Sequence, residues 1–152
     1  MSALARLEKL GLALPPVATP AGAYVPARRT GNLVFTAGQV PFVDGTVAAT
    51  GKVGAEISAE RAYDLARICT LNALAAIDGL VGLDAVTGVV KVVGFVASDP
   101  TFTGQPGVIN GASDLLGEVF GEPGQHARSA VGVAVLPLDV PGEVELTVEV
   151  GG

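Results

Sequence analysis

One apolar stripe along residues 58–80 constrains the fold more than any other feature of the sequence. Eight apolar side chains recur there at helical spacing: Ala62, Leu65, Ala66, Cys69, Ala73, Ala76, Ile77 and Leu80. Ser58 is a good N-cap residue, and Glu60 lies in the first turn, where the helix dipole favours negative charge. The stripe therefore predicts a long helix with one face buried against another layer of structure.

The second half of the chain predicts a further helix and three strands. Apolar residues at helical spacing over residues 108–120, followed by Gly121, predict the helix. The valine-rich run 86–96 predicts a buried strand, and the alternating runs 129–136 and 143–150 predict two more. Strands interleaved with two helices indicate an α+β or α/β sheet that carries its helices on one face.

The first third of the chain has the pattern of a hairpin. Residues 24–28 and 33–36 flank a turn at residues 30–32, whose sequence is Thr-Gly-Asn. We expect residues 39–42 to extend this hairpin, and an Asp-Gly pair at residues 44–45 predicts another turn.

The N-terminal segment differs in character from the rest of the chain. Leucines at helical spacing predict a short helix over residues 2–10, ended by Gly11, and the proline-rich residues 14–20 predict an extended connector. We therefore expect a helix and connector over residues 1–20 and one domain over residues 21–152.

The chain is short of charge for its length. Of its 152 residues, 49% are apolar and 16% are charged, whereas a typical soluble domain has about 25% charged residues. This composition excludes intrinsic disorder and predicts that part of the surface is hidden in an oligomer. The most apolar stretch contains Lys91 and is shorter than the roughly 18–20 residues of a membrane span, so we expect no membrane partner.

The net charge of the chain indicates which partners are disfavoured, and its cysteine content indicates the redox compartment. The net charge of −6 argues against nucleic acid as a partner, because phosphate binding needs a basic surface. The single cysteine, Cys69, cannot form an internal disulfide, which is typical of a reducing compartment such as the cytoplasm. Because Cys69 lies on the apolar stripe, we interpret it as a buried and unreactive thiol.

Few residues have the pattern of a familiar catalytic or metal site. His126 is the only histidine, so no zinc-type ligand set can be assembled and no metal is expected. No nucleophile motif such as G-x-S-x-G accompanies His126, and we interpret it as a loop or capping residue. No complete phosphate-binding loop is present either.

One face of the predicted strand 129–136 combines an arginine with small residues. Arg128, Ala130, Gly132 and Ala134 share this face by the period-two rule. Three small side chains leave space above the sheet, and a guanidinium at the rim suits a carboxylate or phosphate. Alternatively, a neighbouring helix or subunit fills the space and Arg128 pairs with an internal carboxylate.

The last predicted strand carries a row of polar side chains on one face. Glu143, Glu145, Thr147 and Glu149 point one way, and valines and a leucine point the other. Carboxylates two residues apart repel each other, so one of them could have a raised pKa and transfer protons. The alternative is a plain solvated face.

Two blocks of the sequence follow a recognisable pattern. The first is AGAYVPARRTGNLVFTAGQVP (residues 21–41), and the second is HARSAVGVAVLPLDVPGEVELTVEV (residues 126–150). The second block has an Arg-Ser pair before a strand, then a Leu-Pro turn and an acidic strand. In these blocks the chain resembles the reactive-intermediate deaminase family, often called RidA or YjgF, and its differences elsewhere indicate a divergent branch.

The resemblance implies a fold, an assembly and a reaction. It implies a chorismate-mutase-like α+β sheet with two helices on one face, in a homotrimer whose sheets meet around a central barrel-like core. The family's ligand sites lie in clefts between subunits and take small ligands that carry a carboxylate. Type members hydrolyse 2-aminoacrylate and related enamines or imines to a 2-oxo acid and ammonia, and they use no cofactor.

The resemblance also implies roles for individual residues. Arg128 matches the arginine that binds the substrate carboxylate, and Glu143 matches the glutamate that orients the attacking water. Tyr24 matches a tyrosine that lines the pocket, and Gly38 matches a glycine whose backbone helps to hold the ligand. Asn110 matches, with a shift of one residue, an asparagine near the site.

Two departures from the family pattern leave other functions open. Ala37 stands where type members commonly have serine, and Ala130, also placed at the ligand, stands where they commonly have cysteine. Because both changes remove polar groups, a module that binds or senses a small carboxylate without turnover is an alternative to the deaminase. A ribonuclease, an activity attached to some family names, is disfavoured by the acidic net charge.

Overall fold

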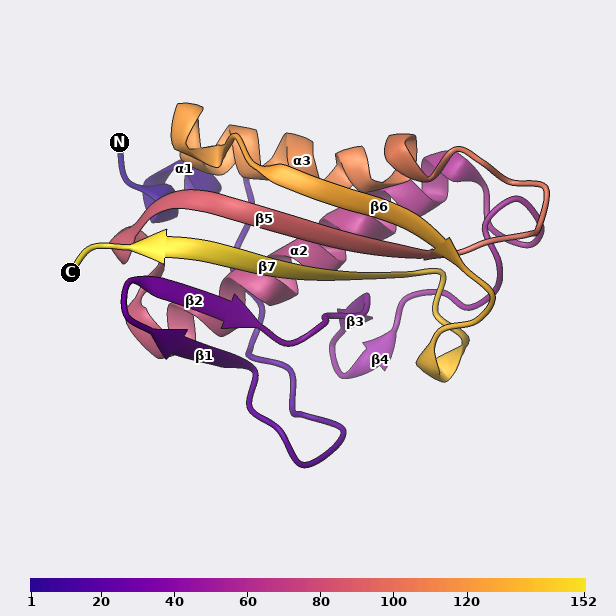
Figure 1. The fold of residues 1–152 in the computed structure, drawn as a ribbon, viewed down its shortest axis with the longest axis horizontal. Coiled ribbons are helices and arrows are strands. Elements are labelled where there is room, and N and C mark those ends of the chain that lie inside the picture. Colours follow the sequence, from indigo (N-terminus) through magenta and orange to yellow (C-terminus); the bar gives the residue numbers. More distant parts are fainter.

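The computed structural model describes residues 1–152 and contains three α-helices and seven strands (Figure 1). The helices are α1 (Ala3–Lys9), α2 (Ala59–Val81) and α3 (Gln105–Phe120). The strands are β1 (Ala27–Thr30), β2 (Leu33–Thr36), β3 (Phe42–Val43), β4 (Thr46–Val47), β5 (Val86–Ala97), β6 (Ala127–Val133) and β7 (Gly142–Val150). Short 3-10 helices are η1 (Leu83–Ala85), η2 (Glu122–Gly124) and η3 (Pro137–Asp139).

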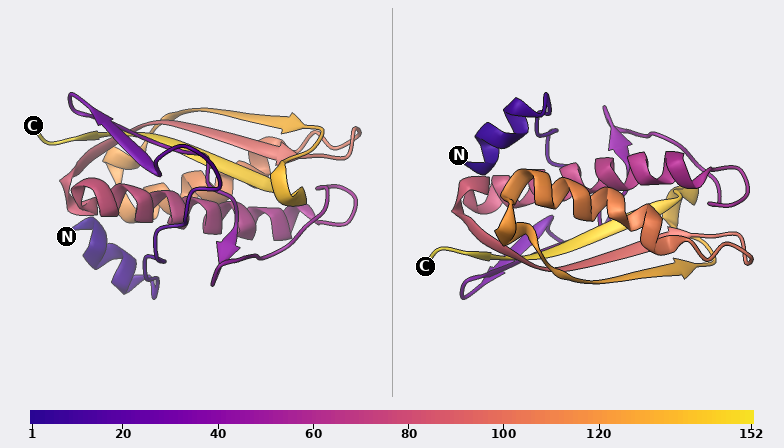
Figure 2. Two further views of the ribbon diagram at one scale, coloured as in Figure 1. Left: turned by 90° about the horizontal axis from the view of Figure 1, so that it is seen from below. Right: turned by 90° about the horizontal axis from the view of Figure 1, so that it is seen from above.

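Five strands form one mixed sheet in the order β1-β2-β7-β5-β6. Strands β5 and β6 are parallel, and every other neighbouring pair is antiparallel. A parallel pair needs a crossover connection, which α3 supplies. Helices α2 and α3 lie side by side on one face of the sheet (Figure 2), which confirms the predicted α+β sheet with two helices on one face.

Helix α2 forms where the apolar stripe predicted it. The Ser58 hydroxyl accepts a hydrogen bond from the Arg61 backbone N–H at 3.1 Å, so Ser58 is the N-cap. Seven of the eight stripe residues are buried, and the last, Leu80, is exposed. The helix ends at Gly82, whose φ of +81° is readily adopted by glycine.

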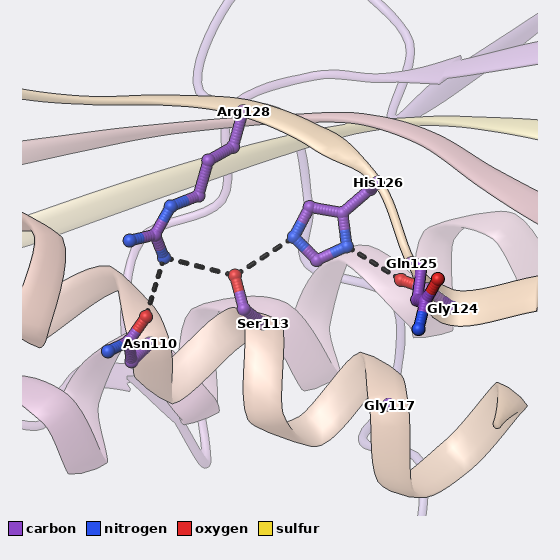
Figure 3. Close-up of a pocket in the computed structure, with 7 residues that line it drawn as sticks. All are labelled: Asn110, Ser113, Gly117, Gly124, Gln125, His126 and Arg128. Carbon is purple, nitrogen blue, oxygen red and sulfur yellow. Dashed lines mark hydrogen bonds between the residues drawn. The ribbon is translucent and has the colours of Figure 1, made fainter. Parts of the chain in front are cut away.

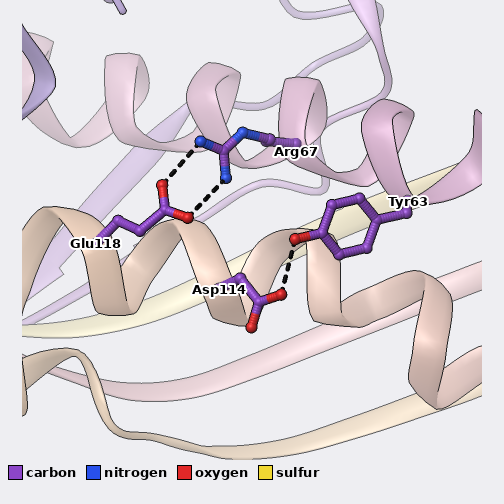
Figure 4. Close-up of polar contacts among 4 residues, drawn as sticks. All are labelled: Tyr63, Arg67, Asp114 and Glu118. Atoms are coloured by element: carbon purple, nitrogen blue, oxygen red, sulfur yellow. Dashed lines mark hydrogen bonds and ion pairs between the residues drawn. The ribbon is translucent and has the colours of Figure 1, made fainter. Parts of the chain in front are cut away.

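Helices α2 and α3 approach closely and are linked by side chains on their outer surface (Figure 4). A Cβ atom at Gly111 would collide with the backbone carbonyl oxygen of Tyr63, so the close approach requires glycine. The Tyr63 hydroxyl donates to Asp114 at 2.7 Å, and Arg67 pairs with Glu118 at 2.8 Å. The hydrogen bond to Asp114 raises the pKa of the Tyr63 hydroxyl.

The boundaries of the first hairpin differ from the prediction. The hairpin β1–β2 exists, but β1 begins at Ala27 and not at residue 24, because Tyr24 bonds within its own segment and Pro26 has no backbone N–H. Residues 39–42 do not extend β2. Gln39 makes a single bridge to Val144, and β3 then pairs with β4 around the predicted Asp-Gly turn.

Two later elements are also displaced from their predicted ends. Helix α3 begins three residues earlier than predicted, with Pro106 in its first turn, where an N–H would have no helical partner. Strand β6 ends at Val133 and not at residue 136. Beyond it the chain turns through η3, in which Leu138 and Asp139 have positive φ angles of 63° and 55°.

The two faces of the main sheet have different surroundings. The alternation predicted for β7 is confirmed, because Val144, Leu146, Val148 and Val150 are buried against the helices. Glu143, Glu145, Thr147 and Glu149, which alternate with these residues, point to the opposite face, which no helix covers. This open face also carries Phe35 and Val131, which are 43% and 44% exposed. A single chain thus leaves an apolar area uncovered.

The predicted N-terminal helix is present as α1 and lies against α3. Its Leu7 is buried in the main core, and the Leu4 backbone N–H donates to Asp84 at 3.2 Å. The division of the chain at residue 20 stays a prediction. None of the helices has the length and apolar character needed to cross a bilayer.

Candidate functional site

Five of the six predicted site residues fall into two separate hollows. The first hollow, of about 380 Å³, lies between α3 and the start of β6 (Figure 3). None of its lining residues is hydrophobic: Asn110, Ser113, Gly117, Gly124, Gln125, His126 and Arg128. We call it the Arg128 hollow.

Arg128 is held in this hollow by neutral groups alone. It lies opposite the buried Val92 in the sheet register and therefore points toward α3. Its Nη1 donates to Asn110 Oδ1 at 2.9 Å and to Ser113 Oγ at 3.1 Å, and its Nη2 donates to the Pro106 carbonyl at 3.1 Å. Neither ion pair of the protein includes Arg128. The predicted alternative of an internal carboxylate partner is therefore wrong.

Counting donors shows what Arg128 can still bind. A guanidinium has five N–H donors, of which three are used here. The remaining two hydrogens are on Nε and Nη2, the two nitrogens that flank one edge of the guanidinium. Arg128 therefore keeps an uncompensated positive charge and a pair of donors that suits a carboxylate.

The open floor predicted beside Arg128 is not there. A Cβ atom at Gly132 would lie 2.8 Å from the Gln105 side chain of α3, and Ala130 packs against the main core. The predicted alternative, that a helix fills the space above the small residues, describes this face correctly. Ala130 consequently lines neither hollow.

The second hollow, of about 330 Å³, contains three other predicted residues, Tyr24, Gly38 and Glu143. We call it the Glu143 hollow. Its wall is partly apolar and includes Val40, Phe42 and Leu138. The lining residues are Ala18, Thr19, Pro20, Ala21, Tyr24, Pro26, Gly38, Gln39, Val40, Phe42, Pro137, Leu138 and Glu143.

Glu143 is half-buried and fits tightly against Gly38. A Cβ atom at Gly38 would collide with the Glu143 carboxylate, so a larger residue at this position would displace the Glu143 side chain. Burial raises the pKa of Glu143, and the negative charge of Glu145 raises it further. The Gly38 backbone N–H donates to no group of the protein. This hollow thus joins a proton-accepting carboxylate to a free backbone donor.

A single chain does not join the two hollows. Arg128 points to the helix-covered face of the sheet, whereas Glu143 lies opposite Phe95 and points to the open face. The structure therefore brings Asn110 to Arg128, and it brings Tyr24 and Gly38 to Glu143, but it keeps the two sets apart.

Sequence reasoning missed Ser113 and dismissed His126. The two residues hydrogen-bond in the Arg128 hollow, with 2.9 Å between Ser113 Oγ and His126 Nε2. One signal was available, since Ser113 lies three residues after Asn110 and therefore on the same face of α3. Cys69 is buried as predicted, and burial raises the pKa of its thiol.

Comparisons with known proteins agree with this architecture. Residues 4–150 match the model of a family described as "YjgF/chorismate_mutase-like, putative endoribonuclease". Protein TCP17 of Trypanosoma cruzi is 43% identical over 147 residues, covering 95% of this chain and 92% of that protein.

Two solved structures show the likeness in three dimensions. The crystal structure of Atu1372 from Agrobacterium tumefaciens, a protein of unknown function, has a TM-score of 0.91 and 42% identity, covering 99% of this chain and 94% of that chain. The structure of Escherichia coli TdcF with bound serine has a TM-score of 0.62 and 28% identity, covering 89% of this chain and 94% of that chain. In sequence and in fold, this chain belongs to the YjgF/chorismate-mutase-like family.

Proposed function

We propose that this protein hydrolyses small enamine or imine acids to 2-oxo acids and ammonia. The observation that carries the proposal is the free edge of Arg128, which has two unused donors and no carboxylate partner within the chain. Two parallel N–H donors match the two oxygens of a carboxylate. The TdcF structure supports a ligand of this class, because the serine bound there carries a carboxylate.

The complete site needs more than one chain. Arg128 and Glu143 point to opposite faces of the sheet, so they cannot both contact one small molecule within a subunit. The open face, with its exposed Phe35 and Val131, needs a cover. In the proposed homotrimer these faces pack together, and the Arg128 hollow of one subunit meets the Glu143 hollow of the next. We place this assembly in the cytoplasm.

The proposed reaction adds water across a C=N bond. An enamine first takes a proton at carbon and loses one from nitrogen, which gives the imine. Water then adds to the imine carbon, and cleavage of the C–N bond releases ammonia and the 2-oxo acid. The Glu143 carboxylate would accept a hydrogen bond from this water and direct its oxygen at the imine carbon, while Arg128 holds the substrate. No cofactor is required.

Replacement of Arg128 by alanine tests the carboxylate clamp. Arg128→Ala should lower kcat/KM for imine hydrolysis by about 10- to 150-fold, because losing a charge-assisted pair costs about 1.5–3 kcal/mol of binding. The assay generates imines from several amino acids in situ and follows the 2-oxo acid released, with and without the protein.

The matched control is Arg61→Ala, which removes an exposed arginine on α2 and should leave the rate unchanged. An Arg128→Ala variant that binds small 2-oxo acids as tightly as the original protein contradicts the assignment of Arg128.

A binding or sensing module is a second candidate, and Ala37 favours it. Ala37 stands next to Gly38 of the Glu143 hollow, and the chain lacks the hydroxyl that type members commonly have at this position. If the protein binds 2-oxo acids but does not exceed the spontaneous rate of imine hydrolysis, this function replaces the deaminase, and Arg128 keeps its role as the anchor.

A further inference from the structure

A chain of three hydrogen bonds leads from a backbone carbonyl to Arg128 (Figure 3). His126 Nδ1 lies 2.6 Å from the Gly124 carbonyl oxygen, and His126 Nε2 lies 2.9 Å from Ser113 Oγ. Arg128 Nη1 then donates to the same Ser113 oxygen at 3.1 Å. These three hydrogen bonds therefore connect η2, the residue before β6, the middle of α3 and β6 itself.

The chemistry of the end groups sets the direction of these bonds. A carbonyl oxygen only accepts, so His126 Nδ1 must carry a hydrogen. In a neutral imidazole the other nitrogen, Nε2, is then an acceptor, and the Ser113 hydroxyl donates to it. The Ser113 oxygen still has a lone pair, which accepts from Arg128. Each of the three hydrogen bonds thus has one donor and one acceptor.

The direction of these hydrogen bonds fixes how the guanidinium of Arg128 is oriented. The Ser113 hydroxyl is fixed by His126 and presents its oxygen to Arg128 Nη1. Asn110 accepts the other Nη1 hydrogen, and the Pro106 carbonyl accepts one from Nη2. Hydrogen bonds at three points restrict the rotation of this planar group, and they orient its free edge before any ligand arrives.

We propose that Ser113 and His126 are positioning residues that fix the carboxylate-binding edge of Arg128. His126 acts through Ser113, and Ser113 acts through Arg128, so neither needs to touch the substrate. This inference rests on the proposed role of Arg128 as the carboxylate clamp.

Substitutions at Ser113 test the inference through binding. The probe is 2-oxobutyrate, and the measurement is its dissociation constant by calorimetry. Ser113→Ala leaves Arg128 Nη1 with one acceptor fewer and should weaken binding about tenfold, the effect of one hydrogen bond to a charged group. Ser113→Thr keeps the hydroxyl and should restore most of the affinity.

The matched control is Ser129→Ala, on the opposite face of β6, where the side chain makes no hydrogen bond within the chain. It should bind 2-oxobutyrate as the original protein does. Circular dichroism of each variant checks that the fold is retained.

Steady-state kinetics separate positioning from catalysis. A misplaced clamp weakens substrate and transition state alike, so Ser113→Ala should raise KM and leave kcat nearly unchanged. His126→Ala, which leaves Ser113 and Arg128 in place, should raise KM in the same way by a smaller factor. A fall in kcat with unchanged KM would overturn the positioning role.

The single histidine provides a spectroscopic signature. The ring nitrogens of His126 can be observed by ¹⁵N NMR without assignment against other histidines. The structure predicts that the neutral ring carries its hydrogen on Nδ1. A ring protonated on Nε2 would reverse the bond to Ser113 and overturn the inference.

The binding measurements distinguish a failure of this inference from a failure of the proposed function. If the original protein binds 2-oxobutyrate and the Ser113→Ala and His126→Ala variants bind it equally well, the inference is wrong and the proposed function stands. If the original protein binds no small carboxylate, the clamp itself is wrong, and the role of Ser113 and His126 falls with it.

Discussion

At the scale of single residues, the surroundings of the two proposed site groups act on their charges in different ways. Arg128 keeps its positive charge available because all three of its partners are neutral. Glu143 is half-buried beside Glu145, and both burial and this like charge favour its protonated form. In the proposed reaction Arg128 is therefore the anchor, while Glu143 is a carboxylate that takes a proton more readily than usual.

The role of Glu143 is tested by a substitution that keeps its size. Glu143→Gln retains one acceptor but loses the negative charge, so turnover should fall by roughly tenfold or more while ligand affinity changes little. Glu145→Gln, on the same face two residues on, is the control and should matter less. Full activity of Glu143→Gln with an imine generated in the assay is incompatible with the proposed mechanism.

Glu143 also predicts how activity depends on pH. Because its pKa is raised above the ordinary value of 4.5, the carboxylate is lost at a higher pH than usual as the solution is acidified. The acid limb of the kcat/KM profile should therefore have its midpoint above 4.5 and disappear in Glu143→Gln. A profile with the same acid limb in both proteins assigns that limb to another group.

The raised pKa of Glu143 also lowers the stability of the folded state at neutral pH. The folded state binds the Glu143 proton more tightly than the unfolded state does. The ionised group therefore weakens folding at neutral pH, and this effect is relieved as the pH falls through the raised pKa. The Tm of Glu143→Gln at pH 7 should be no lower than that of the original protein.

At the scale of elements, the packing of α3 on α2 sets the position of the Arg128 hollow. Asn110 and Ser113 contact Arg128 from α3, and Gly111 between them allows that helix to approach α2 closely. The outer ion pair from Arg67 to Glu118 lies at the surface and contributes less, since exposed ion pairs are worth about 0–1 kcal/mol.

Enlarging Gly111 should disturb this packing. The added Cβ of Gly111→Ala meets a backbone oxygen that cannot move aside, so the free energy of unfolding should fall by about 1–3 kcal/mol. Gly107→Ala on the same helix is the control, because beyond its chain neighbours and the adjacent helix backbone no atom lies within 4 Å of its added Cβ. Its unfolding free energy should stay equal or rise. Urea denaturation measures both, and equal stabilities would show that the helices can separate freely.

At the scale of the whole molecule, the proposed assembly and the proposed function both involve the open face of the sheet. About half of the residues are apolar, and two of the exposed apolar side chains, Phe35 and Val131, lie on this face. Because Glu143 also points to this face, the same association that covers the apolar surface can complete the proposed site.

The proposed trimer is tested by mass and by a charge on the open face. Sedimentation equilibrium at micromolar concentration should give three times the mass of the chain. Val131→Asp should dissociate the trimer, since a buried unpaired carboxylate is unfavourable, and it should abolish imine hydrolysis. Val43→Asp, at an exposed position outside both hollows, should do neither. A monomeric original protein with full activity contradicts the shared site.

Local sequence patterns were enough to predict which elements form and which side chains share a face. The stripe of α2, the alternation of β7 and the hairpin turn are such patterns, because helix and strand geometry repeat every few residues. The parity of β6 likewise placed Arg128 among small residues. The family resemblance then added the roles of Arg128 and Glu143, which stay predictions.

The contacts that those faces make depend on the packing of distant segments. Ser113 and Arg128 are 15 residues apart, and the packing of α3 over β6 brings them together. The same packing fills the space over Gly132 and leaves Arg128 without a carboxylate partner. Strand parity alone does not say which face the helices cover, so the separation of Arg128 from Glu143 also emerged only in three dimensions. Contacts between distant segments depend on the crossing of whole elements, which no local periodicity encodes.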